Sequence, residues 1–138
     1  MSRRRKGRTH AMLSLFSYFV SGTDPEETLK FLEEDRGAGA QVVEFARELM
    51  KGVVEHQKDL DELLEGCLVN WSLDRTGNLE KTLLRIGAYE LLYHEKTPAS
   101  AVIHEAIEIA KDYVPEESIR FLNGVLGSVE KKVRPGGS

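Results

Sequence analysis

Three features that mark secreted and membrane proteins are scarce or missing in this sequence. Cys67 is the only cysteine among 138 residues, so an internal disulfide is excluded and a reducing compartment is indicated. No stretch approaches the roughly 18 uninterrupted apolar residues of a transmembrane helix. The basic start is not followed by an apolar segment with a small-residue cleavage site, so no signal peptide is predicted. These absences predict a cytoplasmic protein without a membrane span.

Acidic residues are missing from the start of the chain, although the whole sequence is acidic. The segment SRRRKGRTH (residues 2–10) holds five cationic side chains, and the first acidic residue is Asp24. The net formal charge of -4 therefore divides into +5 for residues 1–8 and -9 for the remainder. Such asymmetry is typical of a basic arm that meets an acidic partner. A disordered, solubilising terminus has the same composition, and composition alone favours neither interpretation.

The sequence also lacks the residue patterns of common active sites. His104-Glu105 resembles the start of an H-E-x-x-H zinc motif, but the second histidine is missing. His56 falls on the apolar stripe of a predicted helix, which favours a hydrogen-bonded core histidine over a metal ligand. Cys67 falls on the same stripe and is interpreted as a buried, inert thiol. Residues 37–39 have neither the flanking strand nor the lysine of a phosphate-binding loop. We therefore predict no enzyme, no metal site and no cofactor.

Strands are not expected, because no run of residues shows the strict period of two that a half-buried strand needs. Apolar residues recur instead with the helical period, and Gly and Pro stand mainly at boundaries. The fold class is therefore all-α. The predicted helices cover about residues 5–20, 25–36, 40–68, 79–93, 100–113 and 116–133, with one short turn at 72–75. The most apolar of them, 79–93, should form the centre of the C-terminal half.

A break near residues 69–78 divides these helices into two groups of three. Each group is too small to be stable alone. We therefore expect one domain over residues 1–138 made of two packed three-helix bundles. The N-terminal bundle spans about 4–68 and the C-terminal bundle about 72–133, with a basic arm at 1–8. The chain after the last helix should be loose.

One aromatic residue of the last predicted helix lies beside the apolar seam rather than in it. The seam is centred on Leu122 and Leu126. At about 100° per residue, Phe121 lies at one margin of the seam and Asn123 at the other. A ring in that place can cover the edge of the core, or it can stack on an unpaired base while basic residues hold the phosphates. Helical geometry alone leaves both interpretations open.

Several motifs, taken in order, resemble one protein family. The opening RRRKGRTHAMLSLF, the stretch LEKTLLRIGAYELLYHEKTPASAVIHEAIEIAKDY and the later RFLNGVLGSV are similar to the NusB family of bacterial transcription antitermination factors. The resemblance extends from about Arg3 to Val133, and between about 23 and 69 it rests mainly on helical pattern. It implies an all-helical, NusB-like fold of two three-helix bundles packed perpendicular to each other.

The resemblance implies an RNA-binding protein without catalytic activity. Members of the family bind the single-stranded boxA element of nascent RNA together with NusE, a ribosomal protein of the small subunit. The complex helps RNA polymerase to read through terminators, notably in ribosomal RNA operons. The implied partners are therefore boxA RNA, NusE and the RNA polymerase antitermination complex, and no cofactor is implied.

The resemblance also assigns the basic segment and the marginal aromatic residue to RNA binding. Phe16 stands where relatives often have tyrosine, so stacking is kept while a hydroxyl hydrogen bond is lost. Gly7 replaces an alanine-like residue and is expected to fray the first turn, which leaves the arm looser before RNA binds. The full set of implied RNA-binding residues is Arg4, Arg5, Lys6, Arg8, Phe16, Glu80, Glu117, Phe121 and Asn123.

The charge distribution makes the implied binding testable. About four phosphate contacts on single-stranded RNA predict a log–log salt slope of about -3. Against a body of charge -9, the arm alone should bind modestly, so a second protein such as the basic NusE should be needed. Two other functions stay open, namely an RNA-binding partner of an RNA-modification enzyme and a helical adaptor that binds only proteins. Relatives differ in dimerisation, and a homodimer could cover the basic arm.

Overall fold

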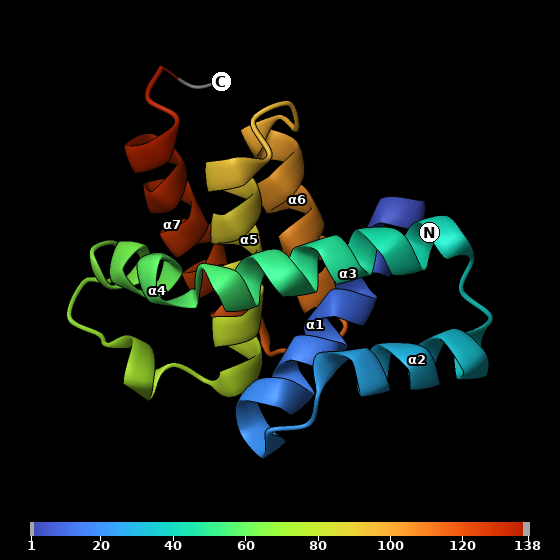
Figure 1. The fold of residues 1–138 in the computed structure, drawn as a ribbon. Coiled ribbons are helices and arrows are strands. Elements are labelled where there is room, and N and C mark those ends of the chain that lie inside the picture. The colour runs from blue at the N-terminus through green and yellow to red at the C-terminus, as the bar shows by residue number, and fades with distance from the viewer. Residues whose placement is uncertain (1, 137–138) are drawn as a thin grey trace. The chain divides into compact units, whose positions relative to one another are not determined.

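The computed structural model describes residues 2–136, and all regular elements within that range are helical (Figure 1). The all-α fold class is therefore confirmed. The chain separates into two compact units, which divide between Glu55 and His56. The predicted domain 1–138 and basic arm 1–8 extend to residues 1 and 137–138, which lie outside the described residues.

The first unit contains three helices, α1 (Arg3–Ser21), α2 (Pro25–Arg36) and α3 (Ala40–Glu55). Asp24 caps α2 by accepting a hydrogen bond from the Glu26 backbone N–H at 3.1 Å, and Pro25 stands in the first turn, as the sequence predicts. Helix α1 packs against both α2 and α3. The fully buried apolar side chains of this unit are Ala11, Met12, Leu15, Leu29, Ala46, Leu49 and Val53.

The basic segment forms the start of α1 and is not a loose arm. Helix α1 begins at Arg3, and Ser2 caps it by accepting a hydrogen bond from the Arg5 backbone N–H at 3.0 Å. The expectation that Gly7 frays the first turn is corrected, because Gly7 lies within the helix. A Cβ atom at Gly7 would stand 2.7 Å from Cδ2 of Phe45. The glycine therefore allows α1 to approach α3 closely.

The second unit is built around one central helix. Its elements are α4 (Gln57–Glu65), the 3-10 turn η1 (Leu73–Arg75), α5 (Asn78–Tyr93), α6 (Ala99–Ala110) and α7 (Glu116–Val133). Helix α5 contacts α4, α6 and α7, and Figure 1 shows it between α6 and α7. Arg85 of α5 joins α4 through paired hydrogen bonds of 2.8 and 3.0 Å to Asp61. The predicted central position of the helix at 79–93 is confirmed.

The long helix predicted for residues 40–68 is interrupted at His56. There the backbone leaves the helical conformation (φ -108°, ψ 15°), so α3 ends at Glu55 and α4 begins at Gln57. The His56 ring stacks on Tyr93 with centroids 4.4 Å apart, and its Nδ1 lies 3.2 Å from the Tyr93 hydroxyl oxygen. His56 is thus hydrogen-bonded, as predicted, but it is half-buried rather than a core residue. Periodicity could not locate the break, because apolar positions continue in phase across it.

The chain beyond α7 is held at Arg134, although the sequence predicts a loose end. The buried Arg134 guanidinium donates hydrogen bonds of 2.5 to 3.2 Å to the backbone carbonyl oxygens of Glu90, Leu91, His94 and Thr97. These carbonyls lie at the end of α5 and in the loop after it, where a helix runs out of N–H donors. The Glu90 and His94 carbonyls also accept a backbone N–H each, from His94 and Thr97, and Arg134 adds charged donors to all four.

Three further observations on residues 2–136 concern the cysteine, membrane-spanning helices and clusters of metal-ligating side chains. Cys67 is buried, and this burial raises the pKa of its thiol, which fits the predicted inert role. Between residues 2 and 136, no helix is both long enough and apolar enough to cross a membrane. Over the same range, no three His, Cys, Asp or Glu side chains gather to hold a metal ion.

Candidate nucleic-acid interface

The first candidate surface lies at the N-terminus of α1, where positive charge is concentrated. Residues 3–6 are all cationic, and the first turn of α1 contains no acidic residue. A helix N-terminus already carries partial positive charge from its unpaired N–H groups, so cations are electrostatically unfavourable there. Helix α2 follows the ordinary rule with Glu26 and Glu27 in its first turn. The reversed pattern in α1 costs stability and produces a strong positive potential that suits an anion such as phosphate.

An aromatic ring of α3 arranges the arginines of this surface. The guanidinium carbon of Arg4 lies 4.6 Å from the centroid of the Phe45 ring, and that of Arg8 lies 5.4 Å from it. Arg3 donates a hydrogen bond from Nη1 to Oε1 of Gln41, which is also on α3. Together Arg3, Arg4, Gln41 and Phe45 line a cavity of about 300 Å³. Cation–π contact holds a planar guanidinium in a defined place, so these cations are partly pre-arranged.

The basic residues differ in how much of each side chain reaches solvent. Arg3, Arg4 and Lys6 are exposed, Arg5 is half-buried, and Arg8 is only 4% exposed. Arg8 therefore supports Phe45 and adds charge from within, whereas the exposed cations can reach a ligand. The family resemblance assigns Arg8 the same role as its neighbours, because nothing in α1 alone reveals the Phe45 ring beside it.

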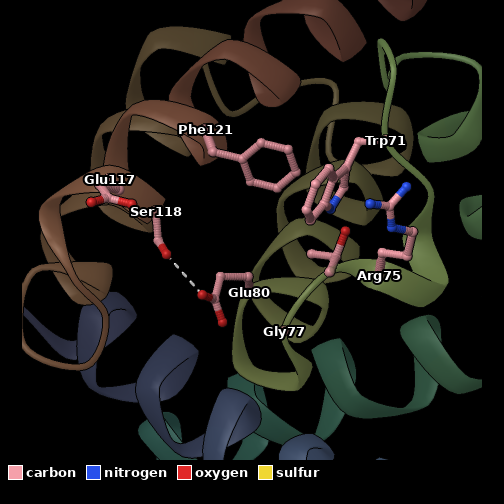
Figure 2. Close-up of a pocket in the computed structure, with 8 residues that line it drawn as sticks. Trp71, Arg75, Gly77, Glu80, Glu117, Ser118 and Phe121 are labelled. Carbon is pink, nitrogen blue, oxygen red and sulfur yellow. Dashed lines mark hydrogen bonds between the residues drawn. The ribbon is translucent and has the colours of Figure 1, made fainter.

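The second candidate surface is a pocket within the second unit (Figure 2). The cavity has a volume of about 260 Å³ and is lined by Trp71, Arg75, Thr76, Gly77, Glu80, Glu117, Ser118 and Phe121. The lining comes from the segment between α4 and α5, from the first turn of α5 and from the first turns of α7. Three residues predicted from the sequence, Glu80, Glu117 and Phe121, are brought together here.

The carboxylate of Glu80 is fixed from two sides. Its Oε2 accepts a hydrogen bond from the Ser118 hydroxyl at 2.8 Å, which ties α5 to α7 (Figure 2). Its Oε1 lies over Gly77, the residue that precedes α5, and a Cβ atom there would stand 2.5 Å from this oxygen. A negative charge in the first turn of a helix is also favourable. The carboxylate is therefore an acceptor in a defined position.

Two aromatic rings line this pocket. Phe121 is half-buried beside the buried Leu122 of the apolar seam, as the sequence predicts. Trp71 precedes η1, is 44% exposed, and has the guanidinium carbon of Arg75 4.6 Å from its ring centroid. Figure 2 shows the Phe121 ring pointing toward Trp71, which lies between Phe121 and Arg75 in that view. The pocket thus combines ring faces with a fixed hydrogen-bond acceptor.

Not every predicted residue lines one of the two cavities, and some lining residues were not predicted. Phe16 is half-buried on α1 and Asn123 is exposed on α7, and neither is among the lining residues. Phe45 was missed because it fits the apolar stripe of its helix. Trp71 was missed because a break between helices has no periodic signal. A tryptophan in a break, followed four residues later by Arg75, was the signal available.

Comparison with known sequences gives matches over nearly the whole chain. A profile of the NusB family matches residues 5–131. Transcription antitermination protein NusB from Heliobacterium modesticaldum is 37% identical over 131 residues, which cover 95% of this chain and 64% of that protein. The protein of the same name from Bacillus velezensis is 36% identical over 131 residues, which cover 95% of this chain and 98% of that protein.

Comparison with solved structures gives the same result for the fold. A crystal structure of the antitermination factors NusB and NusE in complex with double-stranded RNA contains a chain that matches with a TM-score of 0.85. The two chains are 31% identical, and the match covers 96% of this chain and 99% of that one. Sequence and structure therefore agree on the nature of the fold.

Proposed function

This chain belongs to the NusB family, and from this premise we propose that it is an antitermination factor that binds boxA-type single-stranded RNA together with the ribosomal protein NusE. Its role is to help RNA polymerase read through terminators in ribosomal RNA operons in the cytoplasm. The observation that carries the proposal is the cationic N-terminus of α1, where the exposed Arg4 lies over the Phe45 ring and the exposed Arg3 is hydrogen-bonded to Gln41. No catalytic step is part of this function.

The N-terminus of α1 is suited to the phosphates of a single strand. Arg3 and Arg4 present planar guanidinium groups that can pair with phosphate oxygens in a bidentate way, and Lys6 adds a mobile charge. Arg5 and the buried Arg8 strengthen the positive potential from behind. Phosphate contacts of this kind supply affinity and orientation, but they carry little sequence information.

The second surface supplies an aromatic ring and polar groups, which suit bases rather than phosphates. The half-buried ring of Phe121 can stack on an unpaired base, and polar groups beside it can meet base edges. Glu80 and Glu117 bring negative charge to this surface, which limits the affinity for RNA as a polyanion and favours selected contacts. Phe16 and Asn123 are assigned to RNA binding on the family resemblance.

NusE is proposed as the partner that completes tight binding. Outside its first eight residues the chain has a formal charge of -9, which opposes a polyanion and attracts a basic ribosomal protein. The matched crystal structure holds NusB and NusE in complex with double-stranded RNA, and this supports an assembly of the chain with NusE and RNA.

The test is the fluorescence anisotropy of a labelled boxA-like RNA, with and without NusE, over a salt series. We expect weak binding that tightens with NusE, prefers boxA over a scrambled RNA and weakens with salt at a log–log slope of about -3. If boxA and scrambled RNA bind equally poorly with NusE present, the proposal is wrong.

A further inference from the structure

The Trp71–Phe121 pocket has a more specific chemistry than general RNA binding requires. We propose that this pocket holds one unpaired nucleobase of the bound RNA, stacked on Trp71, and that it prefers a base that carries an amino group. This inference rests on the proposed function and identifies a base-reading subsite within it. It assigns Trp71 and Arg75 roles that the sequence resemblance does not give them.

Trp71 has the placement of a stacking platform rather than of a core residue. Its ring is 44% exposed, although tryptophan is highly buried on average. One side of the ring is occupied by the Arg75 guanidinium, 4.6 Å from its centroid, and this contact holds the ring in orientation. In Figure 2 the other side of Trp71 faces Phe121. A planar apolar ligand could therefore enter against a ring that is already held in place.

The size and lining of the cavity match a base better than a phosphate. A volume of about 260 Å³, open to solvent and lined by two aromatic rings, offers stacking to a flat heterocycle. Glu80 and Glu117 repel a phosphate group that enters the cavity. The guanidinium carbon of Arg75 lies 4.6 Å from the centroid of the Trp71 ring, so its positive charge stands beside the cavity and suits the phosphate next to the inserted base.

The fixed carboxylate gives the pocket a preference among bases. An ionised carboxylate only accepts hydrogen bonds, and Glu80 is held by Ser118 and packed over Gly77. Cytosine, adenine and guanine carry amino groups that can donate to it, and cytosine N4 is a known type of partner for Glu. Uracil offers two carbonyl oxygens and one imino N–H, so it satisfies such a site less well. We therefore expect an amino-bearing base over uracil.

The chain allows a direct test, because Trp71 is its only tryptophan. A labelled 12-nucleotide boxA-like RNA is titrated into the full chain, and anisotropy and tryptophan emission are recorded on the same sample. We expect the emission of Trp71 to be quenched in step with binding. Trp71→Leu should weaken RNA binding by on the order of tenfold, since one base–aromatic stack is lost, and Trp71→Phe should restore most of the affinity.

Base preference is tested by replacing each position of the RNA in turn with uridine. One position should show a loss of affinity and of quenching together, and Glu80→Gln should reduce the loss at that position, because an amide can also donate to uracil. Glu116→Gln, an exposed carboxylate one residue from Glu117 that does not line the cavity, is the matched control and should leave the loss unchanged.

The result that overturns the inference is distinct from failure of the proposed function. If the RNA binds by anisotropy while Trp71 emission and the affinity of Trp71→Leu stay unchanged, the base pocket is wrong and the RNA-binding function stands. The emission of tryptophans in NusE is subtracted with the Trp71→Leu variant as the background. If the emission of Trp71 then responds to NusE and not to RNA, the pocket binds protein and the inference is wrong. If no RNA binds under any condition, both proposals fall.

Discussion

The two candidate surfaces use the same pair of chemical groups in opposite ways. At the start of α1, Arg4 and the buried Arg8 lie over the Phe45 ring, and Arg4 is the cation that reaches solvent. In the second unit, Arg75 lies over Trp71, and the ring is 44% exposed. No carboxylate lines the first cavity among the described residues, whereas two line the second.

This difference indicates a division of work. A surface that exposes cations binds the phosphate backbone whatever the sequence, and it depends strongly on salt. A surface that exposes rings beside a fixed acceptor depends on which base is presented, and salt affects it little. The first surface should therefore give affinity, and the second should give selectivity. The following changes test the two surfaces and the units that carry them.

The largest effect is expected on the stability of the second unit, and it should leave RNA binding intact. Arg134→Met introduces an unbranched apolar side chain and removes the guanidinium that donates to four backbone carbonyls. Urea unfolding should show a loss of about 3 kcal/mol, because buried acceptors lose charged partners. Lys131→Met, an exposed neighbour, is the control and should change the stability little.

The folded Arg134→Met protein should still bind RNA as the unchanged chain does, because Arg134 lines neither cavity. A loss of stability under about 1 kcal/mol would mean that the Arg134 hydrogen bonds are not a major support of this unit.

The next largest effect concerns the cationic surface. Replacing Arg3, Arg4 and Lys6 together with Ala should weaken RNA binding about 30-fold at low salt. The log–log salt slope should become less negative by about 2, since each phosphate contact on a single strand contributes about 0.7. Anisotropy over a salt series measures both. The matched variant removes the same charge elsewhere, at the exposed residues Lys30, Lys58 and Lys96, and an equal loss there would refute a localised site.

A smaller effect separates the close contact of α1 with α3 from ordinary helix propensity. Gly7→Ala should lower the free energy of unfolding by about 1–2 kcal/mol, because its Cβ would stand 2.7 Å from Phe45. Gly124→Ala in α7 meets no atom within 4 Å and should raise the stability by up to about 1 kcal/mol. The two alanine variants are compared by urea unfolding. Opposite signs support the contact, and a stabilising Gly7→Ala would contradict it.

The smallest effect is a pH dependence that belongs to the first unit. His10 of α1 is buried, and burial together with Arg36 and Lys6 lowers its pKa below the ordinary 6.5. In the unfolded chain His10 takes up a proton as the pH falls below about 6.5, while in the folded chain it stays neutral. Stability is therefore complete above this pH and decreases below it, down to the lowered pKa.

Urea unfolding at pH 7.5 and at pH 5.5 measures this dependence, and His10→Gln removes its source. If His10→Gln loses as much stability between the two pH values as the unchanged chain does, another group is responsible.

The sequence predicted the fold well where local rules decide it. The Asp24 cap, the central position of α5 and the margin position of Phe121 all follow from spacing and capping. The break at His56 and the clamp at Arg134 did not follow, because each depends on tertiary contacts that local pattern does not contain. Gly7 shows the limit most clearly. The low helix propensity of glycine predicts fraying, whereas in the structure the absence of a side chain at Gly7 leaves room for the Phe45 ring.

The candidate surfaces were predicted in part for the same reason. Charge and family resemblance indicated the arginines, Glu80 and Phe121, because charge and motifs can be read directly from the sequence. Phe45 and Trp71 come from other segments, and only folding brings them beside the arginines and Phe121 respectively. Phe45 has no signal distinct from that of a core aromatic residue, and the signal of Trp71 is its place in a break between helices, four residues before Arg75.

The division of work is tested most directly by one set of binding curves. The Kd of boxA-like and scrambled RNA is measured with NusE over a salt series, for Trp71→Leu and for the Arg3, Arg4 and Lys6 triple variant. We predict that Trp71→Leu loses discrimination between the two RNAs and keeps the salt slope, while the triple variant keeps discrimination and loses slope. If both variants lose slope and discrimination in the same proportion, the two surfaces do not divide affinity from selectivity, and the account is wrong.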